Sequence, residues 1–389
     1  MTTNNNGTLI ESKLPEVKTT IFSTMSALAQ SYQAINLGQG FPDFDCNPAL
    51  IEQVHQAMLA GHNQYPPMPG AAILRHAIAS KVETLYQATY DADTEVTVTA
   101  GATQAIMTTI LACVRTGDEV IVIEPAYDSY LPTIQLAGGI PVLVSMRLDQ
   151  HGFSIDWDAV ASKISSKTRL ILINSPHNPT GMSLTNKDLE NLAALVRDTK
   201  ILLISDEVYE HMVFDGKSHL SLASHAELAQ RSFIISSFGK TYHVTGWKIG
   251  YVLAPKVLSA EFRKVHQFNV FTVNTPMQIG IAHFMQEPAH HLNLPMFYQN
   301  KRDYFCAGLA KTKFKLLPVS GTYFLCADYS EISDRTELDF ATWLTKEIGV
   351  ATIPLSAFYR DQNQHQLVRF CFAKQTKTLD YALERLQKI

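Results

Sequence analysis

The sequence predicts an α/β protein with a three-layer large domain, whose seven-stranded sheet is mostly parallel, and a smaller α+β domain built from the N- and C-terminal segments. From about residue 95, short apolar runs alternate with amphipathic stretches of helical length, which is typical of parallel sheets covered by helices. After about residue 290, this alternation gives way to mixed strands and helices. We therefore expect a large domain over residues 46–290 and a small domain made of residues 1–45 and 291–389.

The expected strands of the large domain are short apolar runs that recur along the chain. They are Glu95–Thr99, Glu119–Ile123, Ile140–Val144, Arg169–Asn174, Ile201–Ser205, Phe233–Ser236 and Ile249–Leu253. Residues 170–173 and 201–204 are apolar without alternation, as expected of strands that are covered on both faces. Helices are expected at Ala102–Val114, Thr185–Arg197 and Ala260–Phe268.

The expected small domain has its clearest elements near the C-terminus. They are a strand at Gly321–Asp328, a helix at Leu338–Ile348, a strand at Gln366–Phe372 and a helix at Thr378–Gln387. The last helix places Leu379, Ala382, Leu383 and Leu386 on one face. No internal repeat, low-complexity tract or long Pro/Ser linker separates the two expected domains, so their boundary is not marked in the sequence.

The low content of charged residues favours a compact and oligomeric globule. Charged residues make up 17% of the 389 residues, whereas an average soluble domain has about 25%. The hydrophobic share of 46% excludes disorder for most of the chain. The net charge of -4 and the lack of a basic block argue against nucleic-acid binding as a main role.

The start of the chain and its cysteines predict a cytoplasmic protein. The first residues, MTTNNNGTLIESK, are polar, and no apolar run reaches the roughly 18 residues that a membrane span needs. The 5 cysteines are scattered and never in a C-x-x-C spacing, so neither a disulfide framework nor a structural zinc site is indicated. We expect reduced, mostly buried thiols and no metal site.

Polar and turn-forming residues follow four of the expected strands. The segments are Ala100-Gly101-Ala102-Thr103-Gln104, Ser175-Pro176-His177-Asn178-Pro179-Thr180-Gly181, Asp206-Glu207-Val208-Tyr209, and Ser237-Phe238-Gly239-Lys240-Thr241, which continues to Thr245-Gly246-Trp247-Lys248. Ligands of open α/β sheets bind outside the carboxyl ends of the strands, so these segments predict a binding site at that edge. Capping and turn chemistry explain each segment alone, but they do not explain four segments at successive strand ends.

Two nucleotide-binding motifs are excluded. Gly239-Lys240-Thr241 is similar to the end of a phosphate-binding P-loop, but that motif needs a glycine five residues before Gly239, where Ile234 stands. No G-x-G-x-x-G follows an expected strand, which removes the main support for a nicotinamide dehydrogenase.

The ordered set of motifs resembles the signature of the class I pyridoxal-phosphate aminotransferases. The matching segments are residues 178–181, Asp206 with Tyr209, Ser237 with Lys240, and residues 245–248. The similarity extends from residues 36–44, NLGQGFPDF, to Val368-Arg369-Phe370, and so spans nearly the whole chain. Within the class, residues 64–70 and 236–243 are most similar to the kynurenine aminotransferase/glutamine transaminase K group, and above all to bacterial methionine aminotransferases.

The resemblance implies that pyridoxal phosphate is the cofactor and that Lys240 bonds to it. Burial and a nearby cation lower the pKa of a lysine amine, as this chemistry requires. The implied catalytic residues are Lys240, Asp206, which partners the pyridine nitrogen, and Tyr209. The implied cofactor-binding residues are Gly101, Ala102, Thr103, Tyr127, Asn178, Asp206, Tyr209, Ser237, Lys240, Lys248 and Tyr65. Position 248 is an arginine in much of the class and a lysine here, a point charge instead of a two-donor fork.

The resemblance also implies how a substrate would be held. The implied substrate-binding residues are Phe22, Gly40, Tyr65, Asn178, Phe271 and Arg369, where the arginine grips the α-carboxylate. Dicarboxylate-specific relatives carry a further arginine where Asn274 stands, and residues 265–300 contain no Arg or Lys. The aromatic lining suits an apolar, thioether or aromatic side chain. Tyr65 and Phe271 would reach in from a neighbouring subunit, so a homodimer is expected.

Three hypotheses for the function follow. The leading one is transamination between an amino acid, with methionine favoured, and a 2-oxo acid by a ping-pong mechanism. The alternative is a carbon–sulfur β-lyase that uses the same cofactor on cysteine conjugates. A third is a binding protein or regulator that keeps the fold without turnover, against which the retained Lys240, Asp206 and Arg369 argue.

Overall fold

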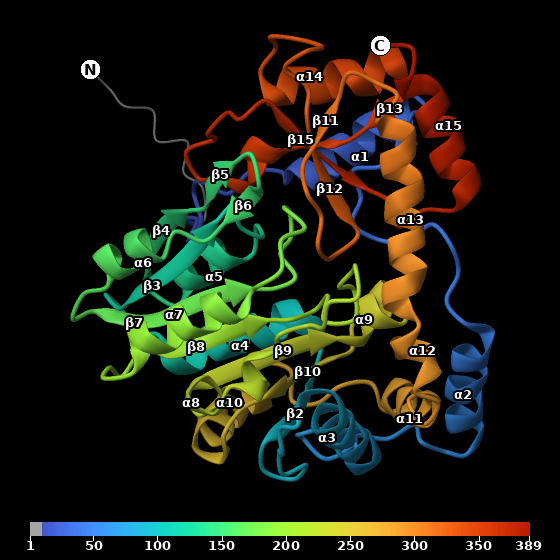
Figure 1. The fold of residues 1–389 in the computed structure, drawn as a ribbon. Coiled ribbons are helices and arrows are strands. Elements are labelled where there is room, and N and C mark those ends of the chain that lie inside the picture. Colours follow the sequence, from blue (N-terminus) through green and yellow to red (C-terminus); the bar gives the residue numbers. More distant parts are fainter. Residues whose placement is uncertain (1–9) are drawn as a thin grey trace.

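The computed structural model of the chain describes residues 10–389. Residues 1–9, which form most of the polar start of the chain and belong to the expected small domain, lie outside the described residues. Figure 1 shows a large sheet with helices on both sides in the lower part of the molecule, and a smaller sheet with its own helices above it. This arrangement confirms the predicted fold class.

The large sheet has seven strands in the order β2-β10-β9-β8-β7-β3-β4. Their bounds are β2 Val96–Thr99, β3 Glu119–Glu124, β4 Ile140–Ser145, β7 Thr168–Asn174, β8 Leu202–Asp206, β9 Ser232–Ser237 and β10 Gly250–Leu253. Only β10 is antiparallel to its neighbours, and the other pairs are parallel. For every expected strand of the large domain, both ends lie within one residue of the ends of an observed strand.

Helices cover both faces of this sheet because alternate residues of each strand point to opposite faces. On one face, Leu170 and Leu172 pack in a cluster with residues of α4 (Gly101–Cys113), α5 (Tyr130–Leu136) and α10 (Lys256–Asn269). On the other face, Ile171 and Ile173 pack with residues of α3 (Ala72–Tyr86), α6 (Trp157–Lys163) and α7 (Asn186–Val196). The large sheet therefore has apolar residues on both faces, as the unbroken apolar runs predict.

The second sheet has four antiparallel strands in the order β11-β12-β15-β14. Their bounds are β11 Lys315–Leu316, β12 Phe324–Asp328, β14 Ile353–Pro354 and β15 Leu367–Cys371. The N-terminal part of the chain joins this region, because β1 (Ile35–Asn36) pairs with β13 (Val350–Ala351). In Figure 1, α1 (Ile21–Ser31), α14 (Glu337–Trp343) and α15 (Thr376–Leu386) surround the smaller sheet at the top of the molecule. Strand β15 lies between two neighbours, so Arg369 is not on an edge strand.

Three elements differ from the sequence-based expectation by more than two residues or in helix type. The strand expected from Gly321 begins at Phe324, because Thr322 takes a left-handed conformation with φ of 65°. The helix expected over residues 338–348 is α-helical over α14 (Glu337–Trp343) and continues as a π-helix at Leu344–Ile348. Helix α10 begins at Lys256, four residues before the expected start, directly after Pro255.

The remaining elements connect the two sheets or cover them. They are α1 Ile21–Ser31, α2 Pro48–Leu59, α3 Ala72–Tyr86, β5 Arg147–Asp149, β6 Gly152–Ser154, α6 Trp157–Lys163, α7 Asn186–Val196, α8 Ala226–Ala229, α9 Phe238–Thr241, α11 Thr275–Phe284, α12 Ala289–Leu292, α13 Leu294–Leu309 and α15 Thr376–Leu386, with 3-10 turns at Leu222–Ser224, Thr245–Trp247 and Leu355–Phe358. The long α13 runs beside both sheets in Figure 1.

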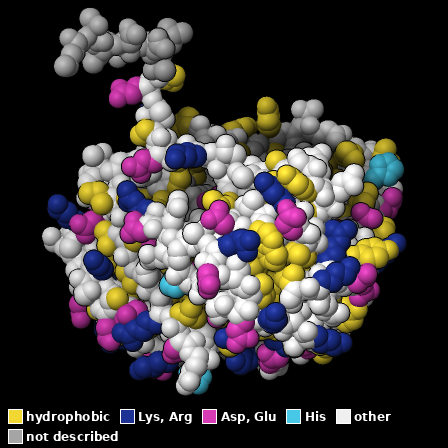
Figure 2. All heavy atoms as spheres, turned by 90° about the horizontal axis from the view of Figure 1, so that it is seen from above, with side chains coloured by type: hydrophobic (Ala, Val, Ile, Leu, Met, Phe, Trp, Pro, Cys, Tyr) yellow, Lys and Arg dark blue, Asp and Glu magenta, His cyan; other side chains and the backbone are white. Residues whose placement is uncertain are grey.

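The surface carries charges of both signs. Lysine, arginine and acidic side chains are interspersed on the face shown in Figure 2. Within residues 10–389, none of the helices has the length and apolar character that a bilayer crossing requires. The cysteines of this part of the chain are all unpaired, and three of them, Cys113, Cys326 and Cys371, are buried.

The contact between α2 and α11 generates a stability prediction. A Cβ atom on Gly280 would lie 2.4 Å from Val54 Cγ2 and 2.8 Å from Val54 N, so no side chain fits there. We expect Gly280→Ala to lower the free energy of unfolding by about 1–3 kcal/mol, because overpacking forces the two helices apart. Gly246→Ala is the matched control, because a Cβ on Gly246 meets no atom within 4 Å. Thermal unfolding of both variants measures the effect, and equal melting temperatures would contradict it.

Candidate active site

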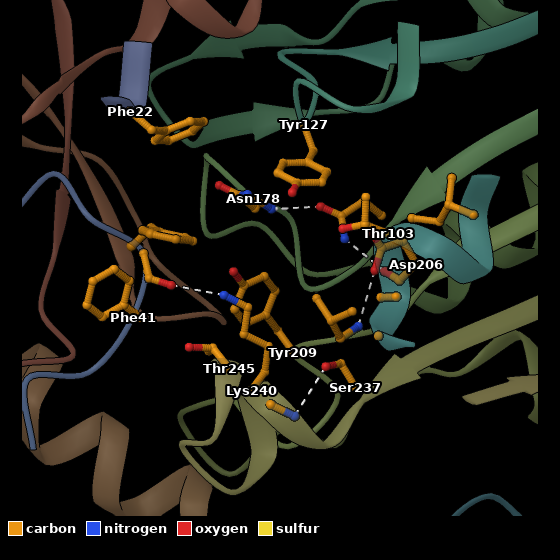
Figure 3. A pocket seen from close by; sticks show the side chains of 18 of the residues that line it. Phe22, Phe41, Thr103, Tyr127, Asn178, Asp206, Tyr209, Ser237, Lys240 and Thr245 are labelled. Carbon is orange, nitrogen blue, oxygen red and sulfur yellow. Dashed lines mark hydrogen bonds between the residues drawn. The ribbon is translucent and has the colours of Figure 1, made fainter. Parts of the chain in front are cut away.

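One pocket brings together most of the residues that the sequence singled out. It lies at the carboxyl ends of β7, β8 and β9, facing the smaller sheet, and Figure 3 shows part of its lining. The predicted residues that line it are Phe22, Gly40, Gly101, Ala102, Thr103, Tyr127, Asn178, Asp206, Tyr209, Ser237, Lys240, Lys248 and Arg369. These residues come from both ends of the chain and from its middle, so only the folded chain forms the pocket.

Asp206 is a buried carboxylate without a cationic partner among the described residues. It ends β8, is 4% exposed, and its Oδ2 accepts a hydrogen bond of 2.6 Å from the Tyr130 hydroxyl. Its other oxygen, Oδ1, accepts only a long contact of 3.4 Å from the backbone amide of Val208. Burial raises the pKa of Asp206 to about 6, although the bond from Tyr130 opposes the rise. A cationic donor from a ligand would stabilise its charged form.

Lys240 is the lysine at the centre of the pocket. It lies in the short helix α9, which follows β9, and Figure 3 shows it beside the ring of Tyr209. Its Nζ donates to the Gly40 carbonyl at 2.9 Å and to the Tyr323 hydroxyl at 2.8 Å. Burial lowers the pKa of Lys240 to about 8, and the nearby Arg369 adds to the decrease. A sizeable fraction of the amine is therefore neutral near physiological pH, as a nucleophile or a base requires.

An anion cradle lies at one end of the pocket, where helix α4 begins at Gly101. The free backbone amides of a helix N-terminus attract anions. Gly101 has φ of 78°, and a Cβ atom there would lie 3.5 Å from Lys248 Nζ, which places that cation beside the helix start. Ser237 lines the same pocket, and its hydroxyl caps α9 by accepting from the Gly239 amide. The chemistry of these donors fits a phosphate group.

Arg369 is a buried cation without a carboxylate partner among the described residues. It is fully buried, and its guanidinium lies 3.9 Å from the ring centroid of Phe324 and 4.9 Å from that of Phe358. Its Nη1 donates to Asn178 Oδ1 at 2.7 Å, whereas its Nε is buried without a hydrogen-bond partner. An unpaired buried cation is costly, so this site favours a ligand that brings a carboxylate.

Backbone carbonyls of residues 38–41 accept hydrogen bonds from the cations around them. Arg369 Nη2 donates to the Gly38 carbonyl at 2.9 Å, and Lys240 donates to the next glycine carbonyl, that of Gly40. Lys374 Nζ donates to the Phe41 carbonyl at 2.8 Å and lies 3.5 Å from that of Gln39. These contacts fix the segment but leave the net charges of the cations uncompensated.

Asn178 and Tyr209 lie on neighbouring segments beside Lys240. The loop after β7 is held by Asn174, whose Oδ1 accepts from the Asn178 amide at 2.9 Å and whose Nδ2 donates to the Asp206 carbonyl at 2.8 Å. Burial raises the pKa of Tyr209, so its hydroxyl stays protonated and can donate. Tyr127 also lines the pocket, with its ring 5.6 Å from that of Tyr130.

Two predicted residues, Tyr65 and Phe271, lie outside this pocket. Their rings pack on each other with centroids 5.3 Å apart, and Tyr65 is 81% exposed. Together with Asn274, Tyr65 belongs to a separate surface hollow formed by residues 63–66 and 272–276. Asn274 caps the N-terminus of α11. The pocket of one described chain therefore does not contain these two aromatic side chains.

Several residues around the pocket were missed from the sequence. Asn174 and Tyr130 line it, together with Phe41 and Phe324, and Tyr323 bonds to Lys240. A signal existed for Asn174, which is the last residue of an expected strand, and for Tyr130, which follows Tyr127 by three residues. Tyr323 had no such signal, because its contacts join segments that are far apart in the sequence.

The donor set fits pyridoxal phosphate. The group carries a phosphate, a basic ring nitrogen and an aldehyde. The start of α4 and Lys248 can bind the phosphate, and the buried carboxylate of Asp206 can pair with the ring nitrogen. The partly neutral amine of Lys240 can react with the aldehyde. Arg369 is left over for the carboxylate of a second molecule.

Comparison with known proteins supports this interpretation. The family model described as aminotransferase class I and II matches residues 32–386. The chain is 49% identical to methionine aminotransferase of Escherichia coli over 386 residues, which cover 99% of this chain and 100% of that protein. It is 36% identical to kynurenine–oxoglutarate transaminase 1 of mouse, with 92% of each chain covered.

Solved structures agree with the sequence comparisons. The chain is similar to the crystal structure of an Escherichia coli methionine aminotransferase, with a TM-score of 0.96, 49% identity, and coverage of 98% of this chain and 100% of that one. It is also similar to N-succinyldiaminopimelate aminotransferase from Mycobacterium tuberculosis, with a TM-score of 0.93, 41% identity, and coverage of 97% and 99%. These matches span the pocket and both sheets.

The lowered pKa of Lys240 generates a prediction for the protein without cofactor. Only the neutral amine attacks an aldehyde, so the rate at which added pyridoxal phosphate produces the visible absorbance of the bound cofactor should rise with pH. The expected midpoint is about 8, well below the ordinary lysine value of 10.5. Stopped-flow absorbance measures this rate, and a midpoint near 10 would contradict the effect of burial.

Two variants test whether Lys240 is the lysine that produces the visible absorbance of the bound cofactor. Lys240→Ala should abolish the visible absorbance. Lys187→Ala should leave it unchanged, because the Lys187 side chain is 75% exposed on α7, away from the pocket. Absorbance that survives in Lys240→Ala would show that another lysine binds the cofactor.

Proposed function

The chain belongs to the class I and II aminotransferase family, and from this premise we propose that its pocket binds an amino acid with an apolar, thioether or aromatic side chain, methionine above all. As a pyridoxal-phosphate-dependent aminotransferase, it transfers an amino group between an amino acid and a 2-oxo acid. The observation that carries the substrate proposal is that Lys240, Lys248 and Arg369 are the only Lys or Arg residues that line the described pocket.

Each of these three cations has a separate role in the proposal. Lys248 and the start of α4 hold the cofactor phosphate, together with Ser237. Arg369 binds the substrate α-carboxylate, helped by Asn178, which already contacts the guanidinium. Lys240 would hold the cofactor and, as a free amine, would move the proton at the substrate Cα. No cation is left for a second carboxylate on the substrate side chain.

Asp206 and Tyr209 act on the cofactor ring in this proposal. Pyridoxal phosphate, when bound, supplies a ring that accepts the electrons left on the substrate Cα. Asp206 would keep a proton on the ring nitrogen, and its burial would strengthen that interaction. Tyr209 and Asn178 would donate hydrogen bonds to the ring oxygen, and Tyr127 would pack against the ring.

The side-chain end of the pocket supports the choice of substrate. The rings of Phe22, Phe41 and Phe324 are among its lining side chains. A thioether makes favourable contacts with aromatic rings, at about 0.3–1.5 kcal/mol each. The Escherichia coli relative at 49% identity is a methionine aminotransferase, which supports the same substrate class here.

We further propose a homodimer in which a second copy of the chain completes the site. Tyr65 and Phe271 would then reach the pocket of the partner subunit, which would account for their exposure in a single chain. The division of the chain at residues 46 and 290 and the cytoplasmic location stay predictions from the sequence.

Two other activities receive less support. The Mycobacterium tuberculosis relative, at 41% identity, is named a probable N-succinyldiaminopimelate aminotransferase, and a succinylated substrate carries an additional carboxylate. The described pocket offers no further cation for that carboxylate. The carbon–sulfur β-lyase alternative finds no support among the relatives compared, which are aminotransferases.

A panel of amino donors tests this proposal. With one 2-oxo acid as acceptor, kcat/KM for methionine should exceed that for aspartate by at least about 100-fold, which corresponds to about 2.8 kcal/mol, because a distal carboxylate would be buried without a partner. N-succinyl-diaminopimelate should react as poorly as aspartate. A preference for either acidic donor would overturn the substrate proposal, and no reaction with any donor would overturn the proposed use of the pocket.

A further inference from the structure

Three polar atoms form a closed triangle of hydrogen bonds beside the pocket. Lys240 Nζ lies 2.8 Å from the Tyr323 hydroxyl oxygen and 2.9 Å from the Gly40 carbonyl oxygen. The Tyr323 hydroxyl and the Gly40 carbonyl are themselves 2.6 Å apart. The triangle joins three segments that are far apart in the sequence: the N-terminal segment, the short helix after β9 and the approach to β12.

Tyr323 is a rigid member of this triangle. It is fully buried, and its ring packs against those of Tyr209, Tyr298 and Phe324 at centroid distances of 5.2, 5.7 and 4.9 Å. Its backbone carbonyl accepts from the Phe372 amide at 3.0 Å, which ties it to the end of β15. The hydroxyl therefore has a fixed position, whereas a lysine side chain with four rotatable carbons does not.

The direction of each proton in the triangle follows from the donors available. The Gly40 carbonyl can only accept, so the single hydroxyl proton of Tyr323 goes to it, along the shortest side of the triangle. The hydroxyl oxygen is then free to accept from Lys240. A neutral amine has two N–H bonds and one lone pair. The Gly40 carbonyl and the Tyr323 hydroxyl accept hydrogen bonds from the two N–H groups, so the lone pair points in the one remaining tetrahedral direction.

We propose that Tyr323 is a positioning residue that aims the lone pair of the released Lys240 amine at the substrate. The inference rests on the proposed role of Lys240 as the base that moves the Cα proton. In that step the Cα–H bond breaks, its electron pair stays with the joined substrate and cofactor, and the proton forms the third N–H bond of Lys240. The other two N–H bonds keep their acceptors, so the ammonium holds the new proton where it was taken up and can return it to a neighbouring carbon.

Other groups that face Lys240 are charged or titratable but are less suited to this role. They are Arg369 and Cys371 from β15, Asp206 from β8, Lys248 and Tyr209. Among the described residues, none of these groups forms a hydrogen bond to Lys240 Nζ, whereas Tyr323 does. Tyr323 does not line the pocket, so it acts through Lys240 rather than on the substrate.

The test uses Tyr323→Phe in the holoenzyme, with Tyr298→Phe as the matched control. The Tyr298 hydroxyl is buried beside Tyr323 but has no hydrogen-bond partner, so its loss should change nothing in catalysis. For Tyr323→Phe, kcat with methionine should fall about 10- to 100-fold, because misplacing a reacting group by about 1 Å can cost a factor of about 100. KM should stay within about 3-fold, since Arg369 is intact. The isotope effect of Cα-deuterated methionine on kcat should increase.

A second readout does not depend on turnover. The rate at which pyridoxal phosphate produces visible absorbance on the apoprotein should also fall in Tyr323→Phe, because the lone pair no longer has a fixed direction. If Tyr323→Phe does not fold, 3,5-difluorotyrosine at position 323 keeps the side chain in place and weakens the hydroxyl as an acceptor, and an intermediate loss is expected. Wild-type values of kcat, isotope effect and attachment rate in the folded variants would overturn the inference. A wild-type protein that neither binds the cofactor nor transaminates would instead overturn the proposed function.

Discussion

The site depends on charges that the described chain buries without neutralising them. Asp206 is 4% exposed and Arg369 is fully buried, and within residues 10–389 the first has no cationic partner and the second no carboxylate partner. Removing one partner from a buried ion pair typically costs about 3–5 kcal/mol, so buried single charges persist only where the fold enforces them. In the proposed function, their partners are the protonated ring nitrogen of the cofactor and the carboxylate of an amino acid. The fold therefore holds two unpaired buried charges, which ligands of opposite charge would stabilise on binding.

The architecture keeps these charges from neutralising one another. Asp206 ends a strand of the large sheet, whereas Arg369 lies in the middle of the smaller sheet. Between the sheets, Arg369 and two lysines donate hydrogen bonds to backbone carbonyls. The acceptors are Gly38 for Arg369, Gly40 for Lys240 and Phe41 for Lys374. A carbonyl dipole orients a cation and offsets part of its desolvation, but it does not cancel the charge. The cations are thus held in place and remain available to anions.

The sequence predicts the large sheet well because its strands are buried on both faces and read as unbroken apolar runs, such as Leu170–Ile173. The reversed direction of β10 leaves no comparable mark, since an apolar run looks the same in either direction. The motif residues converge as expected, because carboxyl ends of neighbouring parallel strands meet at one edge. The triangle of Gly40, Lys240 and Tyr323 could not be predicted, because it depends on how three distant segments pack. Tyr65 and Phe271 do not converge with the other motif residues, because a single described chain does not bring them to its own pocket.

A crystal structure of the protein with pyridoxal phosphate and a non-reactive methionine analogue tests the central claim most directly. The account predicts that the analogue carboxylate forms a two-pronged contact with Arg369, that the ring nitrogen lies within hydrogen-bond distance of Asp206, and that the thioether lies among the aromatic rings of Phe22, Phe41 and Phe324. A carboxylate bound elsewhere, with Arg369 still unpaired, or a ring nitrogen turned away from Asp206, would contradict it.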